Sequence, residues 1–163
     1  MAQFGRLEGT VTSLGPERLA DPHVEGAGED EATSVHIGAE ADLIQVRRTL
    51  RTAATQAGLG LVDQTKLITA GSELARNIVV YATGGQGSMV VTELRSGERR
   101  GVRAAFVDRG PGIADVQLAL TDGFSTSGSL GLGLPGARRL VDELAITSAP
   151  GTGTTVVIVK WAR

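Results

Sequence analysis

Two polar side chains four residues apart, Glu73 and Asn77, mark the first segment whose residue types suit catalysis. They fall within residues 61–81, where apolar residues recur at helical spacing, so both side chains should lie on one helix face. The amide oxygen of Asn77 is a suitable ligand for Mg²⁺, which takes few protein ligands and keeps several waters. Glu73 is placed to orient or deprotonate an attacking hydroxyl. The alternative is a solvated helix face on which Glu73 pairs with Arg76.

A second segment, Asp-Arg-Gly-Pro-Gly-Ile at residues 108–113, follows an alternating apolar run that predicts a strand. Because a carboxylate only accepts hydrogen bonds, Asp108 could receive one from an exocyclic amine such as that of adenine. Gly110 and Gly112 carry no side chains, which would let a flat base approach the backbone. The alternative is an ordinary junction between a strand and a turn, where Asp and Gly are common.

A third segment, residues 127–136, reads SGSLGLGLPG and precedes a predicted helix at 135–144. Free backbone N–H groups at a helix N-terminus bind anions such as phosphate. The G-x-G-x-x-G spacing here is not a dinucleotide fingerprint, because no strand leads into it and no acidic residue follows about twenty residues later. A P-loop is excluded, since no glycine precedes Lys and Ser/Thr, and the H-R-D and D-F-G motifs of eukaryotic-type protein kinases are absent from the sequence.

Composition narrows the class of protein further. The 163 residues fit one domain and contain no cysteine, which excludes disulfides and cysteine zinc sites. The two histidines, His23 and His36, cannot form a zinc site alone, and we expect no catalytic role for either. A net charge of −2 favours neither nucleic acid nor a membrane surface as partner. Without a long apolar run or a signal peptide, the sequence predicts a cytoplasmic protein.

The charge is unevenly distributed along the chain. Residues 1–33 hold two basic and seven acidic residues, a net charge of −5, and are expected to form a flexible tail with at most a short strand near 9–14. Residues 34–163 should form the folded domain. Its predicted helices are 40–57, 61–81, 115–120 and 135–144, and its predicted strands are 35–37, 89–94, 102–108, 145–148 and 154–161. Helices on one face only would make an α+β, two-layer sandwich with a mixed sheet.

Four runs occur in an informative order: SELARNIVVYA, VDRGPGI, DGFSTSGSLGLGLPGARRLVDE and SAPGTGTT. Together they resemble the GHKL ATPase superfamily with its Bergerat nucleotide-binding fold, over about residues 34–163. Within that superfamily the chain resembles the switch serine/threonine kinases of the RsbT type, which are related to anti-sigma-factor kinases. It departs from two-component histidine kinases, because neither histidine lies in a phosphotransfer helical hairpin.

This resemblance assigns a role to each motif residue. It makes Asn77 the Mg²⁺ ligand and Glu73 the catalytic base, and it makes Gly131 and Gly133 phosphate contacts after an ATP lid at about 114–130. The residues that it assigns to nucleotide and adenine binding also include Asp108, Gly110, Gly112, Ile113 and Thr155. Strand alternation independently places Thr155 on the face of Val157 and Val159, which we expect to look into a core or pocket.

The resemblance also implies an activity and partners. It implies an ATP- and Mg²⁺-dependent kinase acting on a STAS-domain antagonist protein in a bacterial stress-response partner switch, with activation of a PP2C-type phosphatase as a second output. One alternative is an anti-sigma factor that sequesters a sigma factor, and another is a module that binds ATP and phosphorylates nothing. Five arginines could form partner surfaces or solvated helix faces: Arg47, Arg48, Arg51, Arg138 and Arg139.

Overall fold

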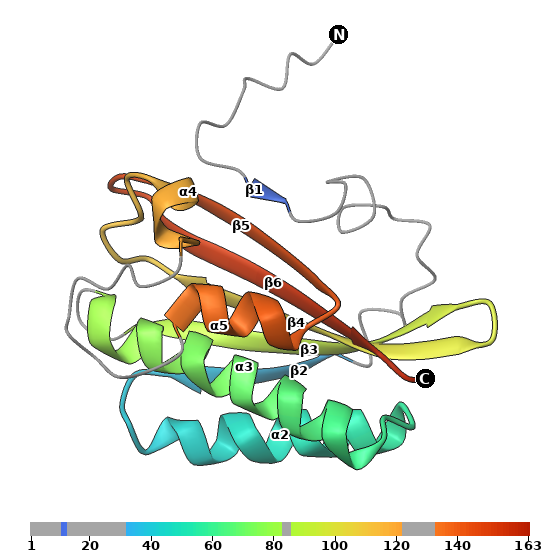
Figure 1. The fold of residues 1–163 in the computed structure, drawn as a ribbon. Coiled ribbons are helices and arrows are strands. Elements are labelled where there is room, and N and C mark those ends of the chain that lie inside the picture. Colours follow the sequence, from blue (N-terminus) through green and yellow to red (C-terminus); the bar gives the residue numbers. More distant parts are fainter. Residues whose placement is uncertain (1–10, 13–31, 83–85, 122–132) are drawn as a thin grey trace, which may run out of the picture.

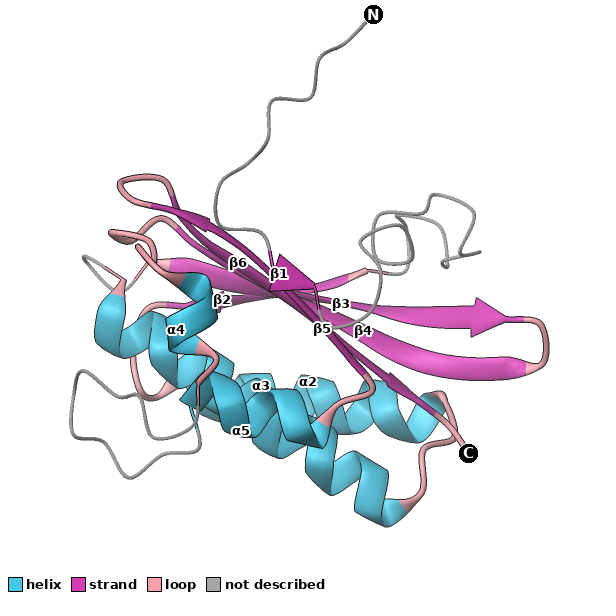
Figure 2. Cartoon of the chain, turned by 45° about the horizontal axis from the view of Figure 1, so that its top comes forward, coloured by secondary structure: helices cyan, strands magenta, loops and turns pink. Residues whose placement is uncertain are grey.

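The protein is described by a computed structural model covering residues 11–12, 32–82, 86–121 and 133–163. One sheet forms the first layer, and helices cover one of its faces (Figures 1 and 2). This confirms the predicted α+β sandwich. The strands are β1 (Val11–Thr12), β2 (Thr33–Ile37), β3 (Gly87–Ser96), β4 (Arg99–Asp108), β5 (Glu143–Ala149) and β6 (Gly153–Trp161), and the helices are α2 (Asp42–Gln56), α3 (Leu61–Tyr81), α4 (Val116–Ala119) and α5 (Gly133–Leu140).

The long helices α2 and α3 follow the predicted pattern closely. Asp42 opens α2, and its Oδ2 accepts hydrogen bonds from the N–H groups of Gly38 (2.8 Å) and Ala39 (2.9 Å), which lower the pKa of this carboxyl. Gly58, at φ +78°, lets the chain reverse between the helices. The apolar stripes of both helices are buried against the sheet, and this packing fixes the position of α3 relative to the sheet.

The sheet order is β1-β5-β6-β4-β3-β2, and every neighbouring pair is antiparallel, whereas we expected a mixed sheet. All pairs are antiparallel because of the elements that connect successive strands. Two helices separate β2 from β3, so β3 returns in the opposite direction. Helices α4 and α5 and then the β5–β6 hairpin follow β4, and β6 rather than β5 lies beside β4. The parallel pair β4 and β5 is therefore kept apart.

The β3–β4 hairpin and the N-terminal region differ from the sequence prediction in their element boundaries. The β3–β4 hairpin continues to a two-residue turn at Gly97 (φ +60°), so both strands are longer than expected. Two residues of the predicted tail, Val11 and Thr12, pair with Ile146 and Ala145 of β5, which confirms a short strand in this region. The domain boundary at residue 33 otherwise stays a prediction.

A buried lysine explains why α5 ends earlier than predicted. Lys160 of β6 is 2 % exposed, and its Nζ lies 3.2 Å from the carboxylates of both Asp63 and Asp142. Asp142 also accepts a hydrogen bond from the backbone N–H of Trp161 (2.8 Å), so the chain must leave the helix before residue 142. Partial burial alone would raise the pKa of Asp142, but these hydrogen bonds and the Lys160 charge outweigh it and lower the pKa.

The first prediction concerns this ion cluster. We expect Asp142→Asn to lower the free energy of unfolding at pH 7 by about 2 kcal/mol, because Lys160 loses one of its two carboxylates. The folded-state pKa of Asp142 is depressed, so this contribution is complete above the unfolded-state pKa and is lost as the pH falls through the folded value. Urea titrations should therefore show a difference in the free energy of unfolding between variant and wild type that is smaller at pH 3 than at pH 7.

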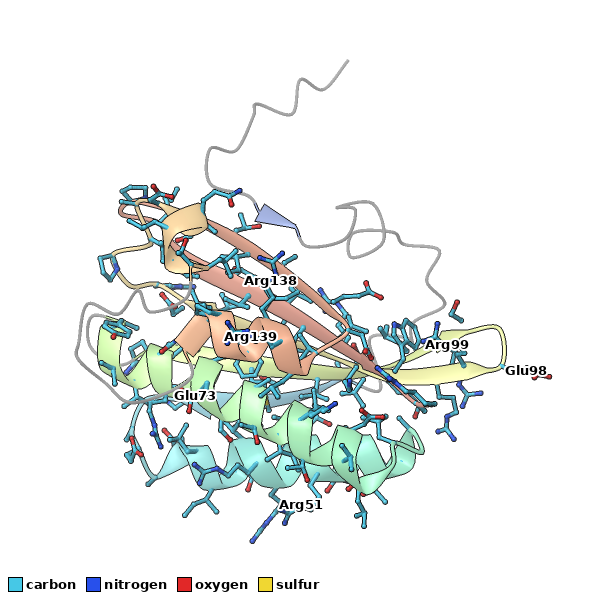
Figure 3. All side chains as sticks on the ribbon, in the orientation of Figure 1. Arg51, Glu73, Glu98, Arg99, Arg138 and Arg139 are labelled. Carbon is cyan, nitrogen blue, oxygen red and sulfur yellow. The ribbon has the colours of Figure 1, made fainter. Side chains whose placement is uncertain are left out.

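The matched control is Glu98→Gln, which removes a carboxylate from the exposed tip of the β3–β4 hairpin (Figure 3). It should leave the free energy of unfolding unchanged at both pH values. Equal stability of Asp142→Asn and wild type, or a gap of constant size from pH 7 to pH 3, would contradict the role given to this cluster.

Candidate functional site

Helix α3 brings Glu73 and Asn77 together beside α5. Both side chains are half-buried on one face of α3, one turn apart, and Figure 3 shows Glu73 on the stretch of α3 next to α5. Arg76 pairs with Glu40 (3.6 Å) rather than with Glu73. Glu73 forms no hydrogen bond or ion pair with any residue that the structure describes. The alternative of a Glu73–Arg76 pair is therefore not supported.

The end of α3 abuts the second motif. A Cβ built on Gly110 would lie 2.8 Å from Cα of Ala82, the residue that follows the last turn of α3. Asp108 is half-buried at the end of β4, and its Oδ1 accepts a hydrogen bond from the N–H of Gly110 (2.8 Å). Its second oxygen has no hydrogen-bond partner among the described residues. One oxygen thus fixes the carboxylate, and the other can accept a hydrogen bond from a base.

The glycines of this motif have a different role from the one expected. We expected Gly110 and Gly112 to clear space for a flat base. Instead, a Cβ on Gly112 (φ +77°) would collide with the carbonyl oxygen of Ala149, and the missing Cβ of Gly110 faces Ala82. These glycines therefore let the Asp108 loop pack against the protein's own backbone, and this packing holds Asp108 in place.

The turn between β5 and β6 and the end of β5 form hydrogen bonds with the loop that follows Asp108. The N–H of Gly151 donates to the carbonyl of Pro111 (2.8 Å), and the N–H of Ile113 donates to Oγ of Ser148 (2.7 Å). Gly153, at φ +91°, lies so close to the carbonyl of Asp108 that a side chain would collide with it. Motifs about forty residues apart in sequence thus form one packed unit. Ile113 belongs to it through its backbone and packs against the core.

The threonine assigned from the sequence lies on the wrong face. Val156 and Ile158 of β6 belong to the core that the helices close, so Thr155, between Thr154 and Val156, points to the opposite face of the sheet. Thr154 is the residue that pairs across the sheet with Asp108, and its Oγ1 lies 2.8 Å from Oγ of Ser148. We therefore assign Thr154 and Ser148 to the base-binding end of the site in place of Thr155.

The phosphate-binding residues are described only in part. Gly131 and residues 122–130 of the predicted lid lie outside the described residues. Gly133 begins α5 at φ +60°, and among the described residues a Cβ there would meet only Pro135, at 3.7 Å. On the near side of the lid, Asp115 caps α4 by accepting from the N–H of Leu118 (2.9 Å). A surface hollow between α4 and α5 is lined by Leu120, Pro135, Arg138 and Arg139.

These residues suit Mg²⁺ and an adenine nucleotide. The part of the chain that the structure describes holds no cluster of three or more His, Asp or Glu residues that could bind a metal. Asn77 offers an amide oxygen, which suits a hard cation that keeps most of its waters. Asp108 offers a free acceptor oxygen at one end, and the start of α5 offers an open, glycine-lined backbone at the other.

A prediction tests the metal role of Asn77. Asn77→Ala should lower ATP affinity in Mg²⁺ to the level that wild type shows in EDTA, because the nucleotide-bound cation loses its one protein ligand. Calorimetric titrations of both proteins, each with Mg²⁺ and with EDTA, measure this. Thr65→Ala, exposed on α3 about three turns before Asn77, is the control and should keep the Mg²⁺ response. An equal Mg²⁺ response in Asn77→Ala and wild type would exclude Asn77 as the ligand.

Comparison with known proteins places this geometry in context. The profile of the family described as "Histidine kinase-, DNA gyrase B-, and HSP90-like ATPase" matches residues 62–162. The chain is 42 % identical over 134 residues to serine/threonine-protein kinase RsbT of Bacillus subtilis strain 168, which covers 82 % of this chain and 99 % of that protein. It is 35 % identical over 112 residues to virulence sensor protein BvgS of Bordetella bronchiseptica, which covers 60 % of this chain and 9 % of that protein.

Solved structures show the same architecture. The crystal structure of the RsbU and RsbW domains of Rv1364c from Mycobacterium tuberculosis matches with a TM-score of 0.56 and 26 % identity, over 81 % of this chain and 33 % of that one. The mycobacterial sensor histidine kinase MprB matches with a TM-score of 0.50 and 20 % identity, over 80 % of this chain and 97 % of that one, which is a likeness of fold alone.

Proposed function

Because the chain belongs to the histidine kinase-, DNA gyrase B- and HSP90-like (GHKL) ATPase family, we propose that it is a cytoplasmic, ATP- and Mg²⁺-dependent protein serine/threonine kinase. Its proposed substrate is a STAS-domain antagonist protein of a bacterial partner switch. The observation that carries this proposal is the carboxylate of Glu73, which has no partner among the described residues and lies one turn from Asn77, on a site whose other end presents Asp108. The 42 % identity to a protein named as a serine/threonine kinase supports it.

The chain's own residues would do three things in this reaction. Asp108, fixed by the Gly110 N–H, would accept a hydrogen bond from the adenine amine, with Thr154 and Ser148 beside it. Asn77 would bind the cation, and the backbone at Gly133 would face the phosphates. Glu73 would accept the proton of the substrate hydroxyl as its oxygen bonds to phosphorus and ADP leaves. Mg·ATP supplies the phosphoryl group and neutralises its charge.

The surface near the lid supports a protein substrate. Arg138 and Arg139 project from α5 and line the hollow with Leu120 and Pro135 (Figure 3). Leu120 lies within the predicted lid and Pro135 follows Gly133 by two residues, so we expect a protein docked at this hollow to reach the phosphate end of the site. Two exposed arginines favour a partner with an acidic surface. We propose that the STAS protein docks here and that a PP2C-type phosphatase is a second partner of the chain.

Separate reactions of the full chain with three partners test the proposal. A STAS-domain protein should be phosphorylated in Mg·ATP, a PP2C-type phosphatase should gain activity without being phosphorylated, and a sigma factor should neither be phosphorylated nor bind. Arg138→Glu should weaken transfer to the STAS protein while keeping ATP affinity, and Arg51→Glu on α2 is the matched control. Tight binding of a sigma factor with no phosphotransfer to any partner would replace the proposal with sequestration.

A further inference from the structure

One side of α3 carries four half-buried polar side chains: Lys66, Thr69, Glu73 and Asn77. None of them forms a hydrogen bond or ion pair with a residue that the structure describes. Successive residues of a helix are about 100° apart around its axis, so Lys66, Glu73 and Asn77 lie within about 40° of one another, and Thr69 lies about 40° from Glu73. These four residues, here called the polar stripe, therefore follow one line along α3.

Polar side chains next to the polar stripe are bonded within the protein. Oγ of Ser72 accepts a hydrogen bond from Nε of Arg47 (3.1 Å), so the side of α3 that holds Ser72 faces α2. Asp63 lies three residues before Lys66, close enough for an ion pair along the helix. Its carboxylate instead lies 3.2 Å from Nζ of Lys160. Lys66 is thus left without an anion although a carboxylate lies one turn away.

The proposed function accounts for only half of the polar stripe. Asp108 lies beyond the Asn77 end of α3, next to Ala82, so the nucleotide site extends away from Lys66. Thr69 is about 6 Å and Lys66 about 10 Å from Glu73 along the helix axis, in the other direction. A group that reaches these two side chains would therefore come from the protein that supplies the hydroxyl and not from the nucleotide.

The surroundings of Lys66 are basic. Helix α5 lies alongside α3 (Figure 1), and the two run in opposite directions, since Asp142 after α5 and Asp63 at the start of α3 bind the same lysine. The last turn of α5 carries Arg138 and Arg139, both exposed, and therefore lies toward the Lys66 end of the stripe. Three cations at this end favour an acidic group on the partner.

We propose that Lys66 binds a carboxylate of the protein substrate about 10 Å from the phosphate-accepting hydroxyl, with Thr69 bonding the substrate backbone between them. In an extended segment this carboxylate is about three residues from the serine or threonine, because each residue of such a segment spans about 3.3 Å. Lys66 thereby selects an acidic substrate and holds its hydroxyl at Glu73. The inference rests on the proposed function and adds a determinant of substrate choice to it.

Steady-state phosphotransfer to a STAS-domain protein tests the contact. Lys66→Gln should raise the KM for that protein about fivefold and Lys66→Glu more than about tenfold, because an ion pair is lost or reversed. The kcat and the ATP affinity should stay within about twofold of wild type, since Lys66 contacts neither the nucleotide nor the reacting atoms. Lys66→Arg should keep the wild-type KM. Arg51→Glu on α2, away from Glu73 (Figure 3), is the matched control and should also keep it.

Ionic strength separates a charge contact from a packing role. The KM of wild type should rise steeply with added salt, because salt screens the attraction between Lys66 and the carboxylate. The KM of Lys66→Gln should rise less steeply. Equal salt dependence of the two proteins would contradict the ion pair.

An exchange of charges identifies the partner carboxylate. Each Asp or Glu within about four residues of the phosphorylated hydroxyl of the STAS protein is changed to Lys in turn. One of these variants should be a poor substrate for wild type and a better one for Lys66→Glu, a reciprocal pattern that a merely structural role of Lys66 does not produce.

The outcomes distinguish this inference from the proposed function. Phosphotransfer by wild type together with an unchanged KM in Lys66→Glu, or without any reciprocal pair, overturns the inference and leaves the kinase activity in place. No phosphotransfer from wild type to any STAS protein would overturn both.

Discussion

Glu73→Gln should lower phosphotransfer to a STAS protein by about 10²–10⁴-fold, the usual range for a lost general base. Glutamine keeps the size of the side chain but cannot accept a proton, so Glu73→Ala should be about equally inactive. ATP affinity should stay within a few-fold of wild type, because a base acts on the transition state and not on adenine recognition. Single-turnover transfer at saturating ATP, with ATP affinity measured separately by calorimetry, separates the two effects.

Glu40→Gln is the matched control for this prediction. It removes the carboxylate that pairs with Arg76, on the neighbouring part of the same surface, and should leave the transfer rate unchanged. A fully active Glu73→Gln would show that the carboxylate only positions its surroundings. Loss of ATP binding together with activity would make Glu73 part of the nucleotide or metal site, and the base role would be withdrawn.

Asp108→Asn should weaken ATP binding by about 5–150-fold, which corresponds to about 1–3 kcal/mol for a buried donor left without an acceptor. The Gly110 N–H holds one oxygen of the native carboxylate. An asparagine oxygen must keep that bond, so its NH₂ group turns toward the adenine amine and donor meets donor. Guanine presents a carbonyl at the corresponding position, so the variant should lose less affinity for GTP than for ATP. Calorimetry with both nucleotides measures the ratio.

Asp42→Asn is the control for this prediction, since it makes the same change in a carboxylate that also accepts backbone N–H groups, at the start of α2. It should leave both nucleotide affinities unchanged. An Asp108→Asn variant with wild-type ATP affinity would remove Asp108 from the base-binding site.

The sequence predicted the elements whose pattern is local. The bounds of α3, residues 61–81, were predicted correctly, because its apolar stripe and the glycine before it are encoded within one segment. The spacing of Glu73 and Asn77 on that helix then follows from helix geometry alone. Asp108 at the end of a strand was predictable for the same reason.

The predictions were wrong where a contact between segments far apart in sequence determines the local structure. Alternation showed that Thr154 and Thr155 lie on opposite faces, but which face holds the site depends on the pairing of Thr154 with Asp108, far away in sequence. Gly112 looked like space for a ligand, because its contact with Ala149 across the loop has no local signal. The helix predicted at 135–144 ends at Leu140, because Asp142 joins Lys160 and Asp63, which come from other elements.

The central proposal is phosphotransfer from ATP to a serine or threonine hydroxyl, and one measurement tests it most directly. Full-length protein, Mg²⁺ and γ-labelled ATP are incubated with a STAS-domain protein, and the label is tested for stability in acid and located by mass spectrometry. We expect acid-stable label on one serine or threonine of the STAS protein and none on the kinase itself. Label that is lost in acid, or label on His23 or His36 of this chain, would contradict the proposed function, as would no label on any STAS protein while ATP is bound.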